Sequence, residues 1–373
     1  MRHFFHLGRS KELAIAEIGS LVGFEGMELD GEYLSIDGEF DQKFQDRLGG
    51  TIAIYSLLGS GADIESQIVS DLEGREGKIS FGIESNYMHK KDTFQILKKV
   101  KKNLKSSGHS VRFVESLNTA SILGNGFLNG KMSVYNLLKF EGDEHLVKLV
   151  GIQNINEYTK RDMEKPYRDA KLGMLPPKLA QIMINLANPS GKVYDPFCGT
   201  GTVLIEAGLM GFDLKGSDIQ SVNIEGSKKN LAWAGFDAHL KVLDATRISS
   251  LDGVSAVVTE GFLGEPKSGN EREADLISEL QELKSLYLQF LTAVAKANTN
   301  PDLSVVFSLP SYKATSMDLL ENLVEKLKPL GYSVEALIPE GNPLGLSAKR
   351  SYIYKRDDQK VFRQIVRLSH IPG

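Results

Sequence analysis

The hydrophobic positions in the second half of the chain fall into short apolar runs that alternate with amphipathic stretches. The expected strands are residues 192–194, 214–217, 240–243, 256–259, 303–308 and 334–338. An alternation of strand and helix is typical of an open parallel sheet covered by helices. The pattern predicts an α/β fold for this half, ending in an antiparallel hairpin of residues 352–355 and 361–368 across Asp357 and Asp358.

The first half of the chain mixes shorter strands and helices, separated by glycine and polar turns. Its expected strands are residues 3–7, 32–36, 51–57, 78–83, 111–114 and 146–154, with helices at 12–21, 41–48 and 92–105. We predict a ferredoxin-like α+β domain at 1–60, a second α+β domain at 61–155, a linker at 156–175 and the α/β domain at 176–373.

Composition narrows the class of protein. The chain has 373 residues, of which 41% are hydrophobic and 25% charged, as in ordinary globular proteins. Its single cysteine excludes a disulfide framework, and its seven histidines form no ligand pair at helical spacing, so no metal is predicted. No stretch approaches the roughly 20 apolar residues of a membrane span. We expect a cytoplasmic protein with no membrane partner, and the pattern favours no particular oligomeric state.

Positive charge is concentrated in one block. The formal net charge is −4, but residues 78–131 hold ten Lys or Arg against three acidic residues. Such a block is able to hold a phosphate backbone, and it is equally typical of a solvated helix face. We predict RNA binding by this block, with the solvated face as the open alternative. The candidate residues are Lys98, Lys99, Lys101, Lys102, Lys105 and Lys131.

A glycine-rich turn follows the first strand of the α/β half. Residues 193–202 read Val-Tyr-Asp-Pro-Phe-Cys-Gly-Thr-Gly-Thr, an apolar strand that ends in an acid and leads through a turn into a helix. Gly199 and Gly201 let the backbone approach a ligand, and the helix start offers free N–H groups. A dinucleotide site needs a third glycine where this chain has Leu204. The turn therefore predicts a small-molecule site that disfavours a pyrophosphate.

Two further acids end the next two strands. Asp218 follows Gly201 by 17 positions, where a carboxylate is able to accept from both hydroxyls of a ribose, and Asp244 is able to accept from an adenine amine. Each acid is equally able to cap a helix. Together with Asp195 they outline a site for an adenosine-bearing cofactor. The predicted cofactor residues are Asp195, Cys198, Gly199, Thr200, Gly201, Asp218, Ile219, Asp244 and Ala245.

These motifs resemble those of a known family. The run Asp195 to Gly201 resembles the first motif of class I S-adenosylmethionine-dependent methyltransferases, particularly those that act on exocyclic amines of nucleobases. Residues 168–180, Arg-Asp-Ala-Lys-Leu-Gly-Met-Leu-Pro-Pro-Lys-Leu-Ala, look like the segment that caps the methionine end of the cofactor in such enzymes. With the order of domains, they resemble the THUMP-containing tRNA guanine-N2 methyltransferases.

That resemblance implies a Rossmann-like class I methyltransferase sheet preceded by an α+β ferredoxin-like/THUMP module. It implies S-adenosyl-L-methionine as the cofactor, tRNA as the partner and RNA binding by residues 61–155. The position of Cys198 within the glycine-rich turn predicts that it packs beside the methionine moiety of the cofactor and does not act as a nucleophile. The activity that the resemblance implies is methylation of the exocyclic amine, N2, of a guanine in tRNA.

The fourth strand departs from the pattern of that family. Amine methyltransferases place Asp or Asn there, followed by two prolines and an aromatic residue, so that oxygens accept from the target amine while the ring stacks on the base. Residues 259–266 of this chain read Thr-Glu-Gly-Phe-Leu-Gly-Glu-Pro. We predict that Glu260 orients the amine and that Phe262 stacks on the base.

Alternative functions stay open at this point. The first is an enzyme with a different target atom. The second is a catalytically inactive tRNA-binding protein or chaperone that keeps the methyltransferase fold. The third, a DNA amine methyltransferase, is weakened by the THUMP-like segment.

Overall fold

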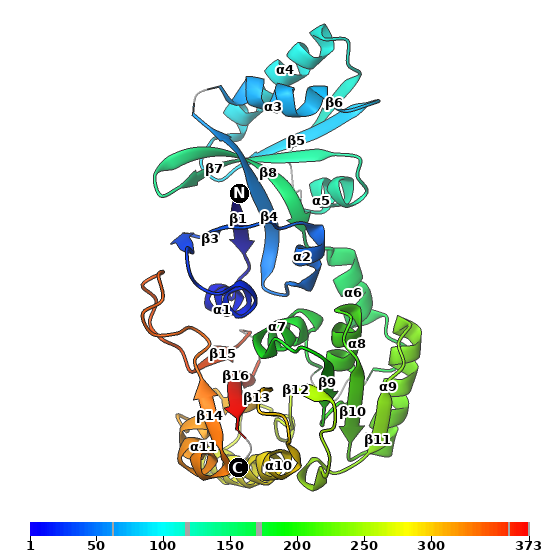
Figure 1. The fold of residues 1–373 in the computed structure, drawn as a ribbon, viewed down its shortest axis with the longest axis vertical. Helices are drawn as coiled ribbons and strands as arrows, with labels where there is room; N and C mark the ends of the chain where they lie inside the picture. Colours follow the sequence, from blue (N-terminus) through cyan, green and yellow to red (C-terminus); the bar gives the residue numbers. More distant parts are fainter. Residues whose placement is uncertain (62, 116–119, 169–173, 357–358, 372–373) are drawn as a thin grey trace. The chain divides into compact units, whose positions relative to one another are not determined.

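The computed structural model describes residues 1–61, 63–115, 120–168, 174–356 and 359–371. The chain forms two units, one from residues 1–11, 25–47 and 51–157 and the other from residues 12–24, 48–50 and 158–373. Figure 1 labels most of their helices and strands. Each unit is built on a sheet of its own.

The first unit is an eight-stranded sheet in the order β2-β3-β1-β4-β8-β7-β5-β6. Its elements are β1 (Arg2–Leu7), β2 (Glu28–Asp30), β3 (Tyr33–Asp37), α2 (Gln42–Arg47), β4 (Thr51–Ser60), α3 (Ile64–Glu73), β5 (Ile79–Ser85), α4 (Lys90–Ser106), β6 (Val111–Val114), α5 (Ala120–Leu128), β7 (Ser133–Phe140) and β8 (Asp143–Ile152). Strand β4 ends at the expected domain boundary and pairs with β8, so strands from both expected N-terminal domains share one sheet. The sheet itself marks no boundary at residue 60, and the expected division stays a prediction.

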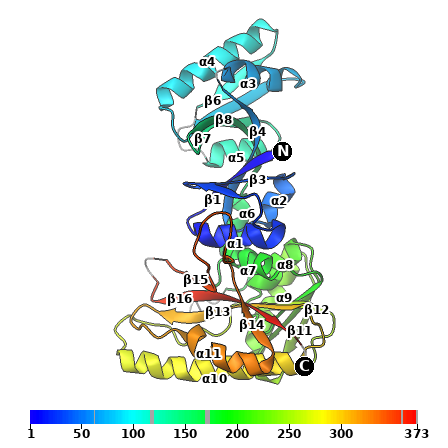
Figure 2. The same cartoon turned by 60° about the vertical axis from the view of Figure 1, so that its left-hand side comes forward.

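Helix α4 is amphipathic, which fixes how it packs on this sheet. Ile96, Leu97, Val100 and Leu104 recur at helical spacing and are buried in one cluster with Phe81 of β5 and residues of α3. Helices α3 and α4 therefore share one face of the sheet, as the upper part of Figure 2 shows. The lysines of α4 lie on the opposite, solvated side of the helix.

The second unit is also built on an eight-stranded sheet, in the order β11-β10-β9-β12-β13-β16-β14 with β15 paired to β16. Its elements are α1 (Lys11–Val22), α7 (Pro177–Ala187), β9 (Lys192–Asp195), α8 (Thr202–Leu209), β10 (Leu214–Asp218), α9 (Ser221–Ala234), β11 (His239–Val242), η1 (Ala245–Arg247), β12 (Val254–Thr259), α10 (Glu273–Ala297), β13 (Leu303–Tyr312), α11 (Leu319–Leu327), η2 (Lys328–Leu330), β14 (Tyr332–Glu335), β15 (Ser351–Tyr354) and β16 (Val361–His370). Helix α6 (Ile155–Met163) spans the division between the two units, because the second unit continues from Tyr158.

The order of strands in the second unit is that of a doubly wound sheet. Strands β11, β10, β9, β12 and β13 are parallel and follow the 3-2-1-4-5 order of the Rossmann fold. Strand β16 is antiparallel to β13, β14 and β15. The predicted Rossmann-like α/β sheet and the predicted pairing of the last two strands are confirmed. Asp357 and Asp358, the expected turn between them, lie outside the described residues.

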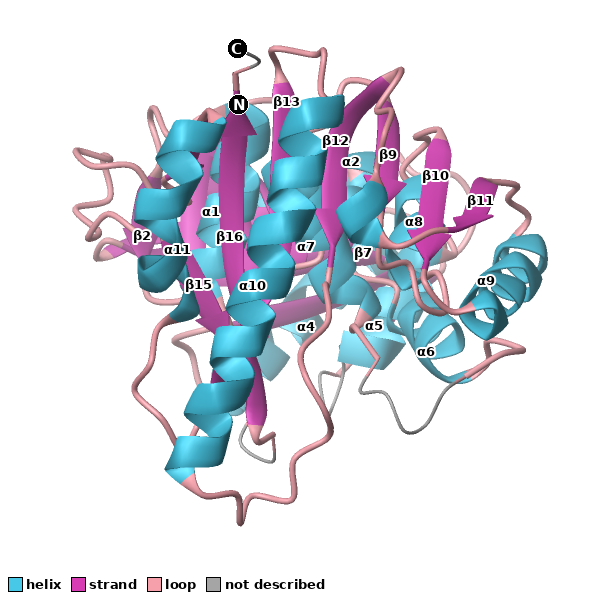
Figure 3. Cartoon of the chain, turned by 90° about the horizontal axis from the view of Figure 1, so that it is seen from below, coloured by secondary structure: helices cyan, strands magenta, loops and turns pink. Residues whose placement is uncertain are grey.

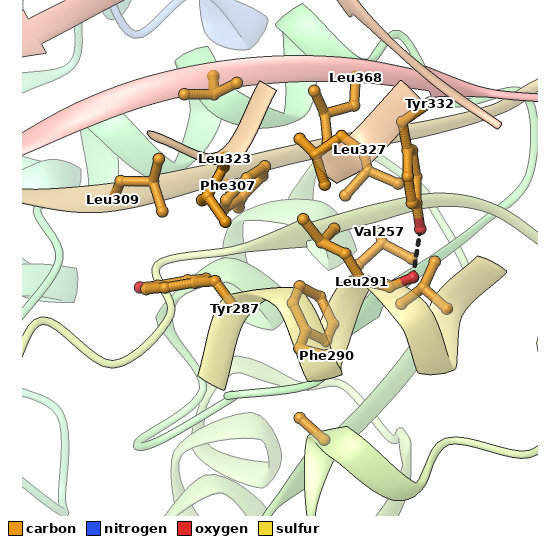
Figure 4. Packing of buried hydrophobic residues seen from close by; sticks show 14 of the residues in the cluster. Val257, Tyr287, Phe290, Leu291, Phe307, Leu309, Leu323, Leu327, Tyr332 and Leu368 are labelled. Atoms are coloured by element: carbon orange, nitrogen blue, oxygen red, sulfur yellow. Dashed lines mark hydrogen bonds between the residues drawn. The ribbon is translucent and has the colours of Figure 1, made fainter. Parts of the chain in front are cut away.

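Helices cover both faces of this sheet because its central strands are apolar on both sides. Along β12, Val257 belongs to the cluster under α10 and α11, while Val258 belongs to the cluster under α7 and α8. Figure 3 shows α10 and α11 in front of the strands and α7 behind them. Figure 4 shows part of the first cluster, in which Phe290 of α10 and Phe307 of β13 pack among aliphatic side chains.

Several elements were not predicted from the sequence. Helix α6 occupies the first part of the expected linker, and helix α5 occupies a stretch that reads as polar and glycine-containing. Strand β7 was also missed, although it pairs with both β5 and β8. Among the described helices, none is long and apolar enough to cross a membrane.

We predict that Tyr332→Phe lowers the free energy of unfolding by about 1 kcal/mol, the usual net contribution of one buried hydrogen bond. The Tyr332 hydroxyl donates to the carbonyl oxygen of Leu291 over 2.8 Å and ties β14 to α10 (Figure 4). The ring of phenylalanine fills the same space, so the change isolates the bond. Urea unfolding measures the difference, and an unchanged midpoint would contradict the assignment.

Candidate active site

The glycine-rich turn between β9 and α8 has the backbone geometry that its sequence predicts. Gly201 caps α8 with φ +84°, and a Cβ there would lie 2.8 Å from the Ser227 hydroxyl oxygen. Gly199 has φ +49°, and a Cβ there would meet only the carbonyl oxygen of Phe197, at 3.9 Å. Glycine is therefore required at 201 by both space and conformation, whereas at 199 it leaves room beside the backbone.

Asp218 joins this turn to the end of β10. Its carboxylate accepts from the backbone N–H of Gly199 over 3.0 Å and of Gln220 over 2.8 Å, and from the Asn223 amide over 3.1 Å. A carboxylate has about four acceptor sites, so three bonds leave it able to accept from a ligand. Asp218 thus positions the turn and also lines the site.

One cavity of about 660 Å³ lies at the carboxyl ends of β9, β10 and β12. In a doubly wound sheet this edge is where ligands bind. The cavity brings together predicted residues that lie far apart in the sequence: Asp195, Cys198, Gly199, Thr200, Asp218, Ile219, Asp244, Ala245, Glu260 and Phe262. Of the predicted site residues in this half, Gly201 is the exception, since its place is at the helix cap.

Two large apolar side chains of this cavity are open to solvent. Ile219 is 66% exposed and Phe262 is 40% exposed. Ile219 follows β10 directly, and Phe262 lies in the loop after β12. Exposed apolar surface in a cavity is suited to packing against flat rings, and an aromatic ring is suited to stacking on a base. The cavity therefore offers apolar contacts on two of its loops.

Asp195 gives the cavity a buried carboxylate. It is 2% exposed, and it accepts from the backbone N–H of Phe197 over 3.1 Å. Burial raises the pKa of Asp195 to about 7, and the neighbouring Asp218 and Glu260 act in the same direction. A cationic ligand would offset this clustering of negative charge, because it favours the ionised carboxylates.

We predict that Asp195→Asn makes the unfolding free energy less dependent on pH. The folded-state pKa of Asp195, about 7, lies above its unfolded value of roughly 3.9, so the folded state binds the extra proton. The stabilisation is complete below the unfolded value and is lost as the pH rises toward 7. The variant should therefore gain stability relative to the unmodified chain between pH 5 and pH 8, measured by thermal unfolding.

Glu206 is a second buried carboxyl group that makes the unfolding free energy depend on pH. The Asp195→Asn variant should therefore keep part of that dependence. It is fully buried on α8, and burial raises its pKa to about 7 as well, with Arg161 opposing the shift. Its contribution has the same sign and stays in the Asp195 variant. Parallel stability curves for the two proteins across this pH range would contradict the assignment to Asp195.

Glu260 forms an ion pair that the sequence did not predict. Arg363 of β16 donates from Nε to the Glu260 carboxylate, and the Arg363 side chain is only 4% exposed. Burial raises the pKa of Glu260, while the Arg363 guanidinium acts against that shift. Residues 361–368 carry two arginines, Arg363 and Arg367, and the sequence does not distinguish the one that reaches Glu260.

The loop after Glu260 is held by hydroxyl groups in place of the missing prolines. The Tyr287 hydroxyl donates to the carbonyl oxygen of Phe262 over 2.9 Å, and the Tyr312 hydroxyl to that of Leu263 over 3.1 Å. The Ser308 hydroxyl donates to the Glu260 carbonyl oxygen over 2.5 Å. These bonds connect the loop to α10 and β13, so the glycines at 261 and 264 do not leave it without support.

Asp244 and Cys198 lie in the cavity wall with local partners. The Asp244 carboxylate accepts from the Thr246 backbone over 2.9 Å and from its hydroxyl over 2.8 Å, and the backbone bond in particular lowers its pKa. Burial raises the pKa of the Cys198 thiol, which disfavours a thiolate nucleophile. The binding of adenine by Asp244 and the packing of Cys198 on the cofactor stay predictions.

The predicted RNA-binding lysines do not all lie together. Lys98, Lys101, Lys102 and Lys105 line one shallow hollow on α4, while Lys99 pairs with Glu65 of α3 over 2.8 Å. The Lys98 ammonium lies 4.3 Å from the centre of the Phe94 ring, and that of Lys101 lies 5.0 Å from that of Phe113. Lys131 is exposed between α5 and β7 and does not line this hollow.

The segment expected to cap the methionine end of the cofactor, residues 168–180, is described only in part. Residues 169–173 of the segment expected to cap the cofactor lie outside the described residues, while Met174 and Leu175 line the cavity. Within the described ranges, no three His, Cys, Asp or Glu side chains are grouped so as to hold a metal ion.

Comparison with known proteins connects this site to a family. A family described as RMKL-like, methyltransferase domain, matches residues 165–315. A tRNA (guanine(10)-N2)-dimethyltransferase of Pyrococcus abyssi is 32% identical over 249 residues, which cover 65% of this chain and 71% of that protein. Proteins of the same name from Methanothermobacter thermautotrophicus and Methanocaldococcus jannaschii are 42% identical over 91 residues and 41% identical over 99 residues, and each match covers 24% of this chain and 27% or 28% of the relative.

Proposed function

The chain belongs to the family of S-adenosyl-L-methionine-dependent tRNA guanine-N2 methyltransferases, and we propose that its cavity methylates the exocyclic amine of guanine 10 in tRNA. Addition of two methyl groups and the position of the guanine follow the names of the relatives. A cytoplasmic site of action follows from tRNA as the substrate. The single observation that carries the proposal is one cavity that joins Glu260 and Phe262 to the acids at the strand ends.

The residues of the cavity fit the proposed cofactor. Asp195 and Asp218 provide negative charge for a ligand that carries a sulfonium and an ammonium group. Asp218 accepts from the ribose hydroxyls, Asp244 from the adenine amine, and Ile219 packs against the adenine ring. Gly199 leaves open space beside the turn where a side chain would otherwise stand.

When bound, S-adenosyl-L-methionine supplies a methyl group on a positively charged sulfur. The contribution of the protein is alignment, and it comes from Glu260 and Phe262. The Glu260 carboxylate accepts a hydrogen bond from the target amine, while the Phe262 ring stacks on the base. Both contacts fix the direction of the nitrogen lone pair. Such positioning of the amine is the main source of rate enhancement, because methyl transfer from a sulfonium needs no general acid.

Transfer of labelled methyl groups to an unmodified tRNA transcript tests the function. We expect N2-methylguanine and N2,N2-dimethylguanine at position 10, identified by mass spectrometry of nuclease fragments. Tight binding of the transcript without transfer would instead indicate a tRNA-binding protein. Transfer to a DNA duplex but not to tRNA would indicate the DNA alternative.

Residues 61–155 are proposed as the part that binds RNA, through the hollow on α4. Replacing Lys98, Lys101, Lys102 and Lys105 together by glutamine should weaken tRNA binding about tenfold and reduce the salt dependence of log Kd by roughly three. A matched variant replaces the exposed Lys228, Lys229, Lys326 and Lys328 of the second unit. Equal losses in the two variants, measured by filter binding between 50 and 300 mM salt, would contradict a specific role of α4.

A further inference from the structure

The ion pair between Glu260 and Arg363 lies in the wall of the cavity, and the proposed function assigns a role to its acid alone. Both side chains line the cavity, and they are 20% and 4% exposed. A buried ion pair adds little net stability, because the cost of removing two charges from water offsets most of their attraction. Stability alone therefore gives a weak reason for an arginine at this place.

We propose that Arg363 is a positioning residue that keeps the Glu260 carboxylate ionised and in one orientation, so that the site selects a base whose amine lies beside a ring N–H, as in guanine. This inference rests on the proposed function of the same cavity. It adds the basis on which the substrate base is chosen. It also assigns a role to β16, a strand that carries neither the glycine-rich turn nor any of the strand-end acids.

Both partners of the pair are anchored by their backbones. Arg363 lies on β16, where it pairs with Pro310 of β13 on one side and Tyr354 of β15 on the other. The Glu260 carbonyl oxygen accepts from the Ser308 hydroxyl of β13. The guanidinium is planar and always charged, so its bond from Nε restricts the rotation of the carboxylate. A flexible glutamate on a glycine turn thereby becomes a fixed acceptor.

The charge of Glu260 depends on the groups that face it. Among the described residues, Glu260 interacts electrostatically with Arg363 of β16, Asp195 at the end of β9 and the Tyr287 hydroxyl of α10. Burial favours the protonated form of Glu260, whereas Arg363 favours the ionised form. Without the guanidinium, Glu260 would therefore hold its proton to a higher pH.

An ionised carboxylate distinguishes bases by what lies beside the amine. Guanine offers an N–H from its amine and another from the adjacent ring nitrogen, and one carboxylate is able to accept both. Adenine and 2-aminopurine place a ring nitrogen lone pair beside the amine, which would face the negative oxygens. Sites that hydrogen-bond an N–H discriminate strongly against analogues that lack it. The Glu260–Arg363 pair therefore favours guanine over these bases.

The base selection is tested with tRNA transcripts that carry guanine or 2-aminopurine at the methylated position. The unmodified protein should prefer guanine by at least about 10²-fold in kcat/KM. In Glu260→Gln the amide N–H₂ is able to donate to the ring nitrogen while the amide oxygen accepts from the amine. That variant should bring the ratio to within about tenfold. An identical ratio in both proteins would overturn the selection by charge.

The role of Arg363 is tested by the pH dependence of kcat in Arg363→Gln and Arg363→Lys. In the glutamine variant the acidic limb should move to higher pH by about one unit or more, with activity recovered above it. Lysine keeps the charge and should restore the limb to near its original position. Arg367→Gln, four residues along the same strand, is the matched control and should leave the limb in place. A uniform loss at every pH would show a merely structural role.

The experiments separate this inference from the function on which it rests. If the unmodified protein transfers no methyl group to guanine, the proposed function is wrong. If it does so while the pH limb and the base ratio stay unchanged in the variants, only the role of the pair is wrong. Carbon-13 NMR titration of the Glu260 carboxylate tests the effect of Arg363 on its protonation without an activity assay. The pKa of Glu260 should rise in Arg363→Gln and should not rise in Arg367→Gln.

Discussion

Replacing Glu260 by alanine should lower kcat for methyl transfer by roughly 10²–10³-fold, the range seen when one transition-state hydrogen bond is removed. The reason is that the target amine would lose the acceptor that fixes its lone pair, while the strand-end acids that face the cofactor stay in place. Affinity for S-adenosyl-L-methionine should therefore change by no more than about threefold. Single-turnover transfer of labelled methyl groups and titration calorimetry measure the two quantities.

The alanine variant also leaves a buried guanidinium without its acid, which costs about 3–5 kcal/mol of stability. A double variant, Glu260→Ala with Arg363→Met, removes both charges and should recover most of that stability while transfer stays low. Glu325→Ala, an exposed acid of α11, serves as the neutral control. Recovery of transfer in the double variant would show that the loss came from misfolding and not from a missing acceptor.

The part of the cavity that we propose for the cofactor was predictable because it is local. A strand, a turn and a helix in immediate succession bring Asp195, Gly199 and Gly201 to one place whatever the rest of the chain does. Asp218 and Asp244 followed from a rule of topology, since parallel strands end at the same edge of the sheet. The hydrogen bond from Gly199 to Asp218 joins the two parts directly.

The part of the cavity that we propose for the substrate base was not predictable in the same way, because its contacts join distant parts of the chain. Arg363 reaches Glu260 across 103 positions, and that contact exists only because β16 runs beside β13. A periodic pattern shows that residues 361–368 form a strand. It does not show which neighbour each side chain meets. The ion pair therefore had to come from the structure.

The loop after the fourth strand illustrates the same limit. Gly261 stands where the family pattern has proline, and a glycine leaves the backbone more conformational freedom. In the structure, Tyr287 and Tyr312 bond its carbonyl oxygens from α10 and β13. Rigidity that prolines supply locally is here supplied by tertiary hydrogen bonds, which leave no local signature. The loop that departs from the family pattern is thus supported by hydrogen bonds from elsewhere in the fold.

Replacing Asp218 by alanine should raise the Kd for S-adenosyl-L-methionine by about 10²-fold, because charge-assisted hydrogen bonds to the ribose are lost at about 1.5–3 kcal/mol each. The Gly199 N–H and the Asn223 amide lose their acceptor as well, so the turn that faces the cofactor loses part of its support. Both effects act on the same ligand. Titration calorimetry with the cofactor alone measures the affinity, and transfer at saturating cofactor should recover a substantial part of kcat.

Asp218→Asn separates the two effects. Its amide oxygen is still able to accept from the Gly199 N–H, but it carries no charge for the ribose hydroxyls, so its Kd should lie between those of the alanine variant and the unmodified chain. Asp213→Ala is the matched control, an exposed acid just before the opposite end of β10. If Asp218→Ala and Asp213→Ala bind the cofactor equally well, the carboxylate at the end of β10 serves the turn alone, and the ribose must be held by other groups of the cavity.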